Sequence, residues 1–283
     1  MNAVIHRRRV IHSHPVPPAA FSAAQRPRRV RLGRARHSTQ IEHTDPVQRP
    51  AQPRSTSVID DHLTPSPTGQ LIDSEGVARP PWAYRSDAEL DYYDNEWGRP
   101  VITEHGLLER ITLEGFQSGL SWATVLRKRR DFRSVFSMFD ATRITAMTES
   151  DRETALSDAR LIRNPQKHRA LYVNAQATVE LRDDPDYQKL PADAPAYRIL
   201  GGAAERLAPG LPVLVWSFVP EVEQRPASLE EIPTTSPEAK ALAKALKSHG
   251  FSFVGPTTCY ALMQAIGMVN DRVDEGEGSA AGC

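Results

Sequence analysis

The chain of 283 residues contains only two cysteines, Cys259 and Cys283. Two cysteines cannot build the disulfide framework of a small secreted domain. Cys259 lies in an apolar stretch, so we interpret it as a small core residue. No apolar run reaches the roughly eighteen residues that a membrane span requires, and the first residues lack the continuous apolar segment of a secretory signal. We therefore expect a cytoplasmic protein without a membrane partner.

The chain also lacks net charge, because 35 basic residues balance 35 acidic ones. This balance hides a split: residues 1–78 contain arginine but no lysine and carry a net charge of +5, which leaves −5 for residues 79–283. The second part is therefore not expected to bind nucleic acid over its whole surface. Any contact with DNA must come from a local patch.

Residues 1–78 have little periodic apolar pattern and are rich in Pro, Arg, Ser and Thr. Such a segment buries too little apolar surface to offset its ordering entropy, which predicts a disordered extension. It would be either a basic arm that holds DNA non-specifically or a dispensable extension. The acidic, glycine-rich residues 275–283 are expected to form a flexible tail.

Residues 79–274 are expected to form one all-α domain without a strand pair. Apolar periodicity and capping signals predict helices over about 104–117, 122–133, 150–159, 165–180, 237–249 and 257–268. Ser150 and Glu153 have the spacing of a capping box. Residues 182–211 mix Asp, Pro, Gly and Ala, which indicates a surface insertion.

Glu114 is the most unusual candidate residue, because it falls on the same helical stripe as Leu107 and Ile111. That spacing points its carboxylate toward apolar surroundings. A buried carboxylate is costly unless it meets a donor or a cation. Glu114 is therefore either a functional acid or a buried salt-bridge partner.

Four aromatic residues are close to Glu114 in sequence: Trp82, Tyr92, Trp97 and Trp122. Each could be an ordinary core residue. Flat rings beside a buried acid also suit a pocket for a flat, polar and cationic ring. A nucleobase is such a ring.

The segment LIRNPQKHR, residues 161–169, joins two expected helices and is basic. The start of its second helix presents backbone N–H groups where a phosphate can bind. The alternative is an ordinary helical hairpin with a solvated basic face. The run RKRRDFR, residues 127–133, has the same two interpretations.

The chain resembles the 3-methyladenine DNA glycosylase I (Tag) family. The resemblance rests on YYDNEWGRP, LEGFQSGLSWATVLRKR, LIRN, VWSFV and GFSFVGPTTCYALMQAIGMVND, which follow in order between about residues 79 and 271. It implies a helix-hairpin-helix DNA glycosylase-like bundle that flips 3-methyladenine out of alkylated double-stranded DNA and hydrolyses its N-glycosidic bond. An abasic site and free 3-methyladenine would be the products.

The resemblance also implies roles for the site residues. Glu114, the candidate catalytic residue, and Tyr92 would hydrogen-bond the flipped base, Trp122 would stack on it, and Trp82 and Trp97 would help to wall the pocket. The family lacks a catalytic aspartate, so catalysis would come from positioning and electrostatics. We expect Glu114 to work in its ionised form.

DNA-binding residues are implied in the same way. Gly119 and Leu120 would lie on the loop that approaches the gap left in the duplex. Arg163, Asn164 and Lys167 fall on the hairpin, residues 160–167, whose backbone amides would bind phosphate.

Members of the family hold one structural zinc, and this chain departs from them at all four ligand positions. Those positions are occupied by Pro80, Tyr93, Arg272 and Gly276. None is a usual zinc ligand, so we expect neither a metal site nor any cofactor. An ion pair between Arg272 and Asp94 would be one substitute for the zinc.

Three further departures concern activity. Glu89 replaces a tyrosine of the family's pocket region, Arg160 replaces a hairpin glycine, and Pro165 enters the turn. Residues 174–216 also form a segment about twenty residues longer than in the family, consistent with a surface insertion.

Two other function classes stay open at this stage. One is a non-catalytic alkylated-DNA lesion-binding protein, and the other is a purine-binding module that has lost its contact with DNA. We expect the protein to be a monomer.

Overall fold

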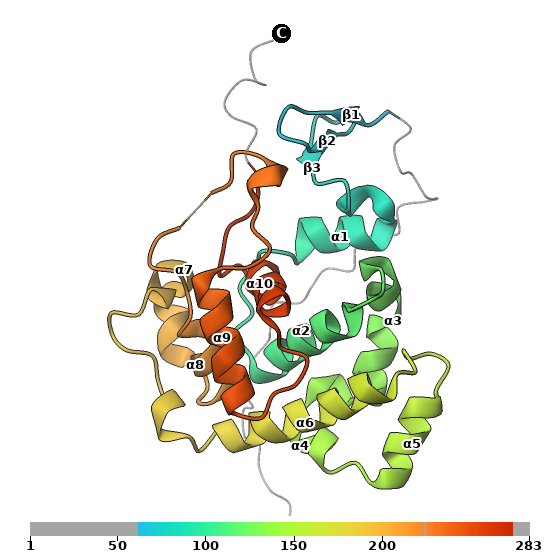
Figure 1. Ribbon diagram of the computed structural model, residues 1–283, viewed down its shortest axis with the longest axis vertical. Helices are drawn as coiled ribbons and strands as arrows, with labels where there is room; N and C mark the ends of the chain where they lie inside the picture. Colours follow the sequence, from blue (N-terminus) through green and yellow to red (C-terminus); the bar gives the residue numbers. More distant parts are fainter. Residues whose placement is uncertain (1–61, 224, 274–283) are drawn as a thin grey trace, which may run out of the picture. The chain divides into compact units, whose positions relative to one another are not determined.

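The computed structural model describes residues 62–223 and 225–273, and it is mostly helical (Figure 1). This confirms the expected all-α class. The helices are α1 (Asp87–Asn95), α2 (Glu104–Gln117), α3 (Trp122–Val135), α4 (Ala141–Thr145), α5 (Glu149–Ser157), α6 (Pro165–Leu181), α7 (Ala196–Leu200), α8 (Leu211–Trp216), α9 (Pro237–Ser248) and α10 (Pro256–Ala265).

Side-chain caps set most helix starts. The hydroxyls of Thr103, Ser121 and Ser236 each accept a hydrogen bond from a backbone N–H in the first turn of α2, α3 and α9. The capping box of α5 is formed by Thr148 and Asp151. Our prediction of Ser150 and Glu153 was therefore wrong, because the helix begins one residue before Ser150.

The first described residues form a small antiparallel sheet, which corrects two expectations. Strands β1 (Thr64–Pro65), β2 (Leu71–Ile72) and β3 (Ala78–Arg79) pair in that order. The predicted extension therefore ends earlier than residue 78, and strand pairs are present. The amide of Leu229 donates to the carbonyl of Thr68, which ties this sheet to the loop before α9. The expected disorder of residues 1–61 and flexibility of 275–283 lie outside the described residues.

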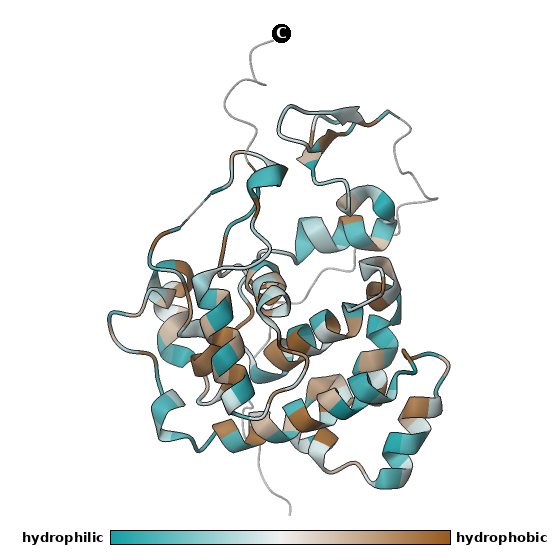
Figure 2. Cartoon of the chain, viewed as in Figure 1, coloured by the Kyte–Doolittle hydropathy of each residue, from teal (hydrophilic) through white to brown (hydrophobic). Residues whose placement is uncertain are grey.

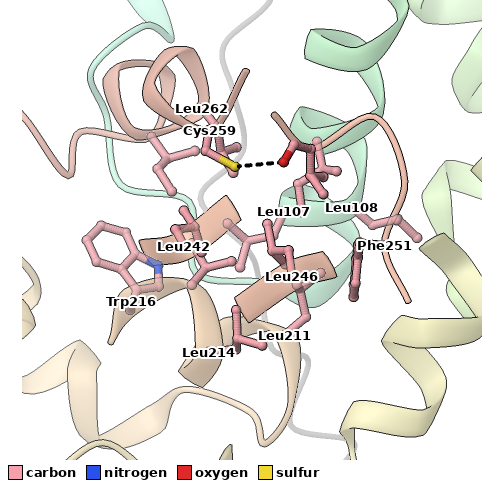
Figure 3. Packing of buried hydrophobic residues seen from close by; sticks show 14 of the residues in the cluster. Leu107, Leu108, Leu211, Leu214, Trp216, Leu242, Leu246, Phe251, Cys259 and Leu262 are labelled. Atoms are coloured by element: carbon pink, nitrogen blue, oxygen red, sulfur yellow. Dashed lines mark hydrogen bonds between the residues drawn. The ribbon is translucent and has the colours of Figure 1, made fainter. Parts of the chain in front are cut away.

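The centre of the core is α2, in which every residue from 107 to 116 is buried. Figure 3 shows Leu107 and Leu108 of α2 facing Leu242 and Leu246 of α9. Cys259 of α10 lies in the same cluster, and its thiol donates to the carbonyl of Val254. Burial raises the pKa of this thiol to about 12. The interpretation of Cys259 as a core residue is confirmed.

Hydrophobic and hydrophilic residues alternate around α9, as Figure 2 shows, and its buried residues follow the helical period. Helices α5 and α6 form the hairpin expected from the sequence, joined by residues 158–164. Residues 182–211 are more ordered than a surface excursion, because they contain α7 and bury Leu190, Ala196 and Leu207 in the core. None of the helices within residues 62–223 and 225–273 could cross a membrane.

Candidate functional site

Glu114 lies in the last turn of α2, and only 8% of its surface is exposed. The predicted burial is therefore confirmed. Burial raises the pKa of its carboxyl from the ordinary 4.5 to about 7, and the charge of Arg110, one helical turn earlier, opposes the shift. No donor among residues 62–223 and 225–273 hydrogen-bonds the carboxylate. Glu114 is thus a buried acid that is poorly solvated.

Arg110 forms its ion pair with another acid, so its charge offsets the burial of Glu114 only in part. Its Nη2 donates to the carboxylate of Glu96 at 2.7 Å, and its guanidinium lies over the ring of Tyr92 at 5.5 Å from the centroid. Glu96 also accepts from Arg129. These ion pairs hold α2 against α1 and α3, and they leave Glu114 outside the network.

Two aromatic side chains from different helices meet close to this acid. The rings of Tyr92 on α1 and Trp122 on α3 lie 5.2 Å apart at an angle of 57°. The Tyr92 hydroxyl and the Trp122 indole N–H are buried without a hydrogen-bond partner among the described residues. A buried polar atom without a partner costs free energy. Both atoms are therefore candidates for contacts with a bound molecule.

A second aromatic group continues the same wall. Trp97 stacks on Tyr93 at 5.3 Å, and the edge of Trp82 contacts both rings. Trp82 and Trp97 are partly exposed, whereas Tyr93 is buried. The structure thus brings together all four aromatic residues singled out from the sequence.

The acid and both aromatic groups line one cavity of about 630 Å³, a volume typical of small-molecule sites. Sequence reasoning missed several of its lining residues, which come from the sheet, from the loop before α9 and from α10. They are Gln70, Leu229, Ile232, Pro233, Thr234, Thr257, Tyr260, Ala261 and Gln264. Gln70 carried no signal, because it lies in the segment predicted to be disordered. Glu89 lines the cavity without filling it.

A larger cavity of about 930 Å³ shares Trp97, Tyr260 and Asp271 with this one. Its buried carboxylate, Asp271, already accepts hydrogen bonds from Tyr260 and Gln264. It therefore lacks the unpartnered buried acid that distinguishes the smaller cavity. We assign the functional site to the cavity of Glu114.

The loop between α2 and α3 lies at this cavity. Gly119 has a φ of +77°, a conformation that favours glycine. The next residue, Leu120, lines the cavity and is 39% exposed. An exposed apolar side chain beside a cavity that can hold a base is well placed to enter a gap in a base stack.

Lys167 was expected to contact DNA, and the structure contradicts this role for its side chain. The ammonium is buried and donates to the carbonyls of Phe116 at 2.7 Å and Ser118 at 2.6 Å. It thereby satisfies carbonyls at the end of α2, which have no partner within the helix. Burial lowers the pKa of this ammonium. Lys167 positions the end of α2, where Glu114 lies.

The rest of the hairpin remains compatible with phosphate binding. The side chain of Asn164 accepts from the amides of Gln166 and Lys167, so these two amides are already used. The amides of Ile162 and Arg163 have no acceptor within the described chain, and the side chain of Arg163 is exposed. These two amides, not those at the start of α6, are available to an anion.

The departures in the hairpin have structural explanations. Arg160 pairs with Asp158 at 2.6 Å, and Pro165 occupies the first position of α6, where its missing N–H costs nothing. Lys128 of α3 donates to the carbonyls of Ala159 and Arg160 and so holds the turn. The turn is therefore held by these contacts although the glycine is replaced.

The positions that hold zinc in the family do not fit a metal here. Arg272 donates to the carbonyls of Tyr93 and Trp97 at 2.6 and 2.9 Å, and its guanidinium lies 4.3 Å from the centre of the Tyr93 ring. Pro80 offers no side-chain donor. Gly276 lies outside the described residues, among which there is no group of three metal-binding side chains.

The expected pair of Arg272 with Asp94 was wrong. Asp94 is held by Arg79, whose Nε donates to it at 2.7 Å. Arg272 instead binds backbone carbonyls and an aromatic face.

The family model described as methyladenine glycosylase matches residues 82–191 and 204–277. The gap falls within residues 174–216, the segment expected to be longer than in the family. DNA-3-methyladenine glycosylase 1 of Escherichia coli is 40% identical over 197 residues, covering 68% of this chain and 91% of that protein. The Haemophilus influenzae DNA-3-methyladenine glycosylase is 38% identical over 202 residues, covering 70% and 96%.

Solved structures of 3-methyladenine DNA glycosylases are also similar to this chain. A crystal structure of 3-methyladenine DNA glycosylase I is 41% identical, with a TM-score of 0.54 over 66% of this chain and 91% of that one. The Staphylococcus aureus enzyme, solved to explain its recognition of 3-methyladenine, is 22% identical, with a TM-score of 0.56 over 68% and 90%. At that identity the likeness concerns the fold.

Proposed function

The chain belongs to the methyladenine glycosylase family, and from this premise we propose that it excises 3-methyladenine from alkylated DNA by hydrolysing the N-glycosidic bond. The observation that carries the proposal is the unpaired, buried carboxylate of Glu114 in a cavity walled by Tyr92 and Trp122. A base must leave the stack to reach such a site.

Glu114 suits the charge of the substrate. A purine alkylated at N3 and still attached to its sugar is a cation, whereas adenine is neutral. In the free protein the carboxyl has a pKa of about 7 because it is buried. A cation that enters the cavity lowers this pKa and favours the ionised form. The free energy of burying the acid is then offset only by a positively charged base.

The chemical step needs little acid catalysis. When the glycosidic bond breaks, its electron pair moves onto the base and cancels the positive charge, so the leaving group needs no proton. Water then adds to the sugar carbon and loses a proton to solvent. The protein contributes by holding the base between rings and by electrostatics.

The duplex would be held at two places, the loop between α2 and α3 and the hairpin. Leu120 would enter the gap left by the base, and the amides of Ile162 and Arg163 with the Arg163 guanidinium would bind a phosphate. Both features lie on exposed loops.

We also propose that the protein acts as a cytoplasmic monomer without zinc. The contacts of Arg272 replace a metal at the end of the described chain.

Release of 3-methyladenine from methylated duplex DNA, followed by chromatography, tests the function. We expect release by the wild type, strong loss with Trp122→Ala and Glu114→Gln, and an unchanged rate with Glu153→Gln, which alters an exposed acid on α5. Arg163→Ala should weaken DNA binding at all sequences and reduce its salt dependence.

Failure of the wild type to release base would refute the proposal. In that case, affinity for methylated DNA would indicate a lesion-binding protein. Affinity for free 3-methyladenine without affinity for DNA would indicate a purine-binding module.

A further inference from the structure

A second carboxylate lines the proposed base cavity. Glu89 is only 1% exposed and lies on α1, three residues before Tyr92, so both side chains occupy one face of that helix. Glu114 comes from α2. The cavity is therefore approached by acids from two different helices.

The contacts of Glu89 do not require its charge. The hydroxyl of Ser86 donates to its carboxylate at 2.9 Å, and its own amide donates to Ser86 at 3.3 Å. This is a helix-capping arrangement in which glutamine serves as well as glutamate. No basic side chain of the described residues forms an ion pair with Glu89, so its charge has no assigned purpose within the protein.

The other charges at the cavity leave a negative balance. Among the described residues that line it, the carboxylates are Glu89, Glu114 and Asp271, and the basic residue is Arg85, which is exposed. Asp271 is held by Tyr260 and Gln264. Glu89 and Glu114 are the two buried acids that a bound cation could compensate.

We infer that Glu89 is a specificity-determining residue, which selects positively charged purines over neutral ones at the site proposed for 3-methyladenine. This inference rests on the proposed function. Glu114 contacts the base, whereas Glu89 acts through the electrostatic potential of the cavity.

The charge of the substrate during the reaction determines which kinetic constant depends on the charge of Glu89. The base is a cation while attached to its sugar and becomes neutral as the bond breaks, because it keeps the electron pair. A carboxylate beside the base therefore stabilises the bound substrate more than the transition state. Glu89 should lower KM without raising kcat.

The test is Glu89→Gln, which keeps the helix cap and removes the charge. For release of 3-methyladenine from methylated DNA, we expect KM to rise about tenfold, as a screened charge pair several ångströms apart allows, and kcat not to fall. Inhibition by free 3-methyladenine, measured at mildly alkaline pH where this base is neutral, should stay constant. Glu89→Asp keeps the charge and should retain a KM closer to the wild-type value.

Asp91→Asn is the matched control, because Asp91 is exposed on the same helix. It should leave both constants unchanged. An unchanged KM for Glu89→Gln, or an equal loss of affinity for the free base, would overturn the inference while leaving the function intact. Absence of base release by the wild type would overturn the function and this inference together. Thermal unfolding of each variant checks that the cap is preserved.

Discussion

The folded protein should be less stable when Glu114 is ionised, and a comparison of its stability with that of Glu114→Gln should reveal this. The carboxyl of Glu114 has a pKa of about 7 in the folded protein, against an ordinary value of 4.5. The folded state therefore holds a proton that the unfolded state has lost between these values. By linkage, the free energy of unfolding falls as the pH rises through this window.

The magnitude follows from the shift. A change from 4.5 to about 7 corresponds to about 3 kcal/mol. The favourable contribution of the protonated acid is fully present below pH 4.5 and is lost above about 7. Glutamine has the same shape and does not titrate, so the wild type should lose about 3 kcal/mol relative to Glu114→Gln across this range.

Urea denaturation of both proteins at several pH values measures the difference directly. Only the change of this difference in unfolding free energy with pH is informative, because altered packing in the variant adds a contribution that does not vary with pH. Glu109→Gln is the control on the same helix. The pKa of Glu109 is lowered by hydrogen bonds to Arg133 and Arg129, which outweigh burial. The contribution of Glu109 is present above its ordinary pKa and lost on acidification, so this control should have the opposite sign.

A difference between wild type and Glu114→Gln that does not vary with pH would refute the reasoning. It would mean that the carboxylate is solvated or paired in the folded protein. The charge-based recognition of a cationic base would then lose its foundation.

Three other predictions follow from particular contacts. Tyr92→Phe removes a buried hydroxyl without a partner, so we expect weaker binding of 3-methyladenine by calorimetry without loss of stability; a destabilisation above about 1 kcal/mol would contradict this. Lys167→Met removes the donor to the carbonyls of Phe116 and Ser118 at the end of α2 and should cost about 2 kcal/mol in urea unfolding; a changed salt dependence of DNA binding would instead support a phosphate contact. Arg272→Ala should destabilise by about 2 kcal/mol, whereas a chelator should leave the melting temperature of the wild type unchanged; stoichiometric zinc in the purified protein would refute the second expectation.

Local sequence patterns determined many of the helix positions and the burial of Glu114. The helical period placed Glu114 on the stripe of Leu107 and Ile111, and the structure buries all three. The bounds of α2 agree with the prediction, since its cap and its periodicity both lie within the segment. The long motifs identified the family, which the comparisons bear out.

Which of two similar side chains makes a given contact was decided only by the tertiary structure. Arg163 and Lys167 lie in one basic segment, yet only Lys167 reaches the end of α2, which is 51 residues away along the chain. Arg272 likewise binds the carbonyls of Tyr93 and Trp97, whereas Asp94 is held by Arg79. A charged group takes the partner that packing brings within reach.

The pocket itself is the clearest product of tertiary packing. Gln70 and Leu229 line it because the sheet and the loop before α9 meet there, a contact that no local periodicity encodes. The pKa of Glu114 depends on the same packing, since it reflects how much solvent the surrounding helices exclude. Sequence periodicity predicted that Glu114 would be buried, and only the assembled helices decided that it, unlike the buried Glu109, would remain without a partner.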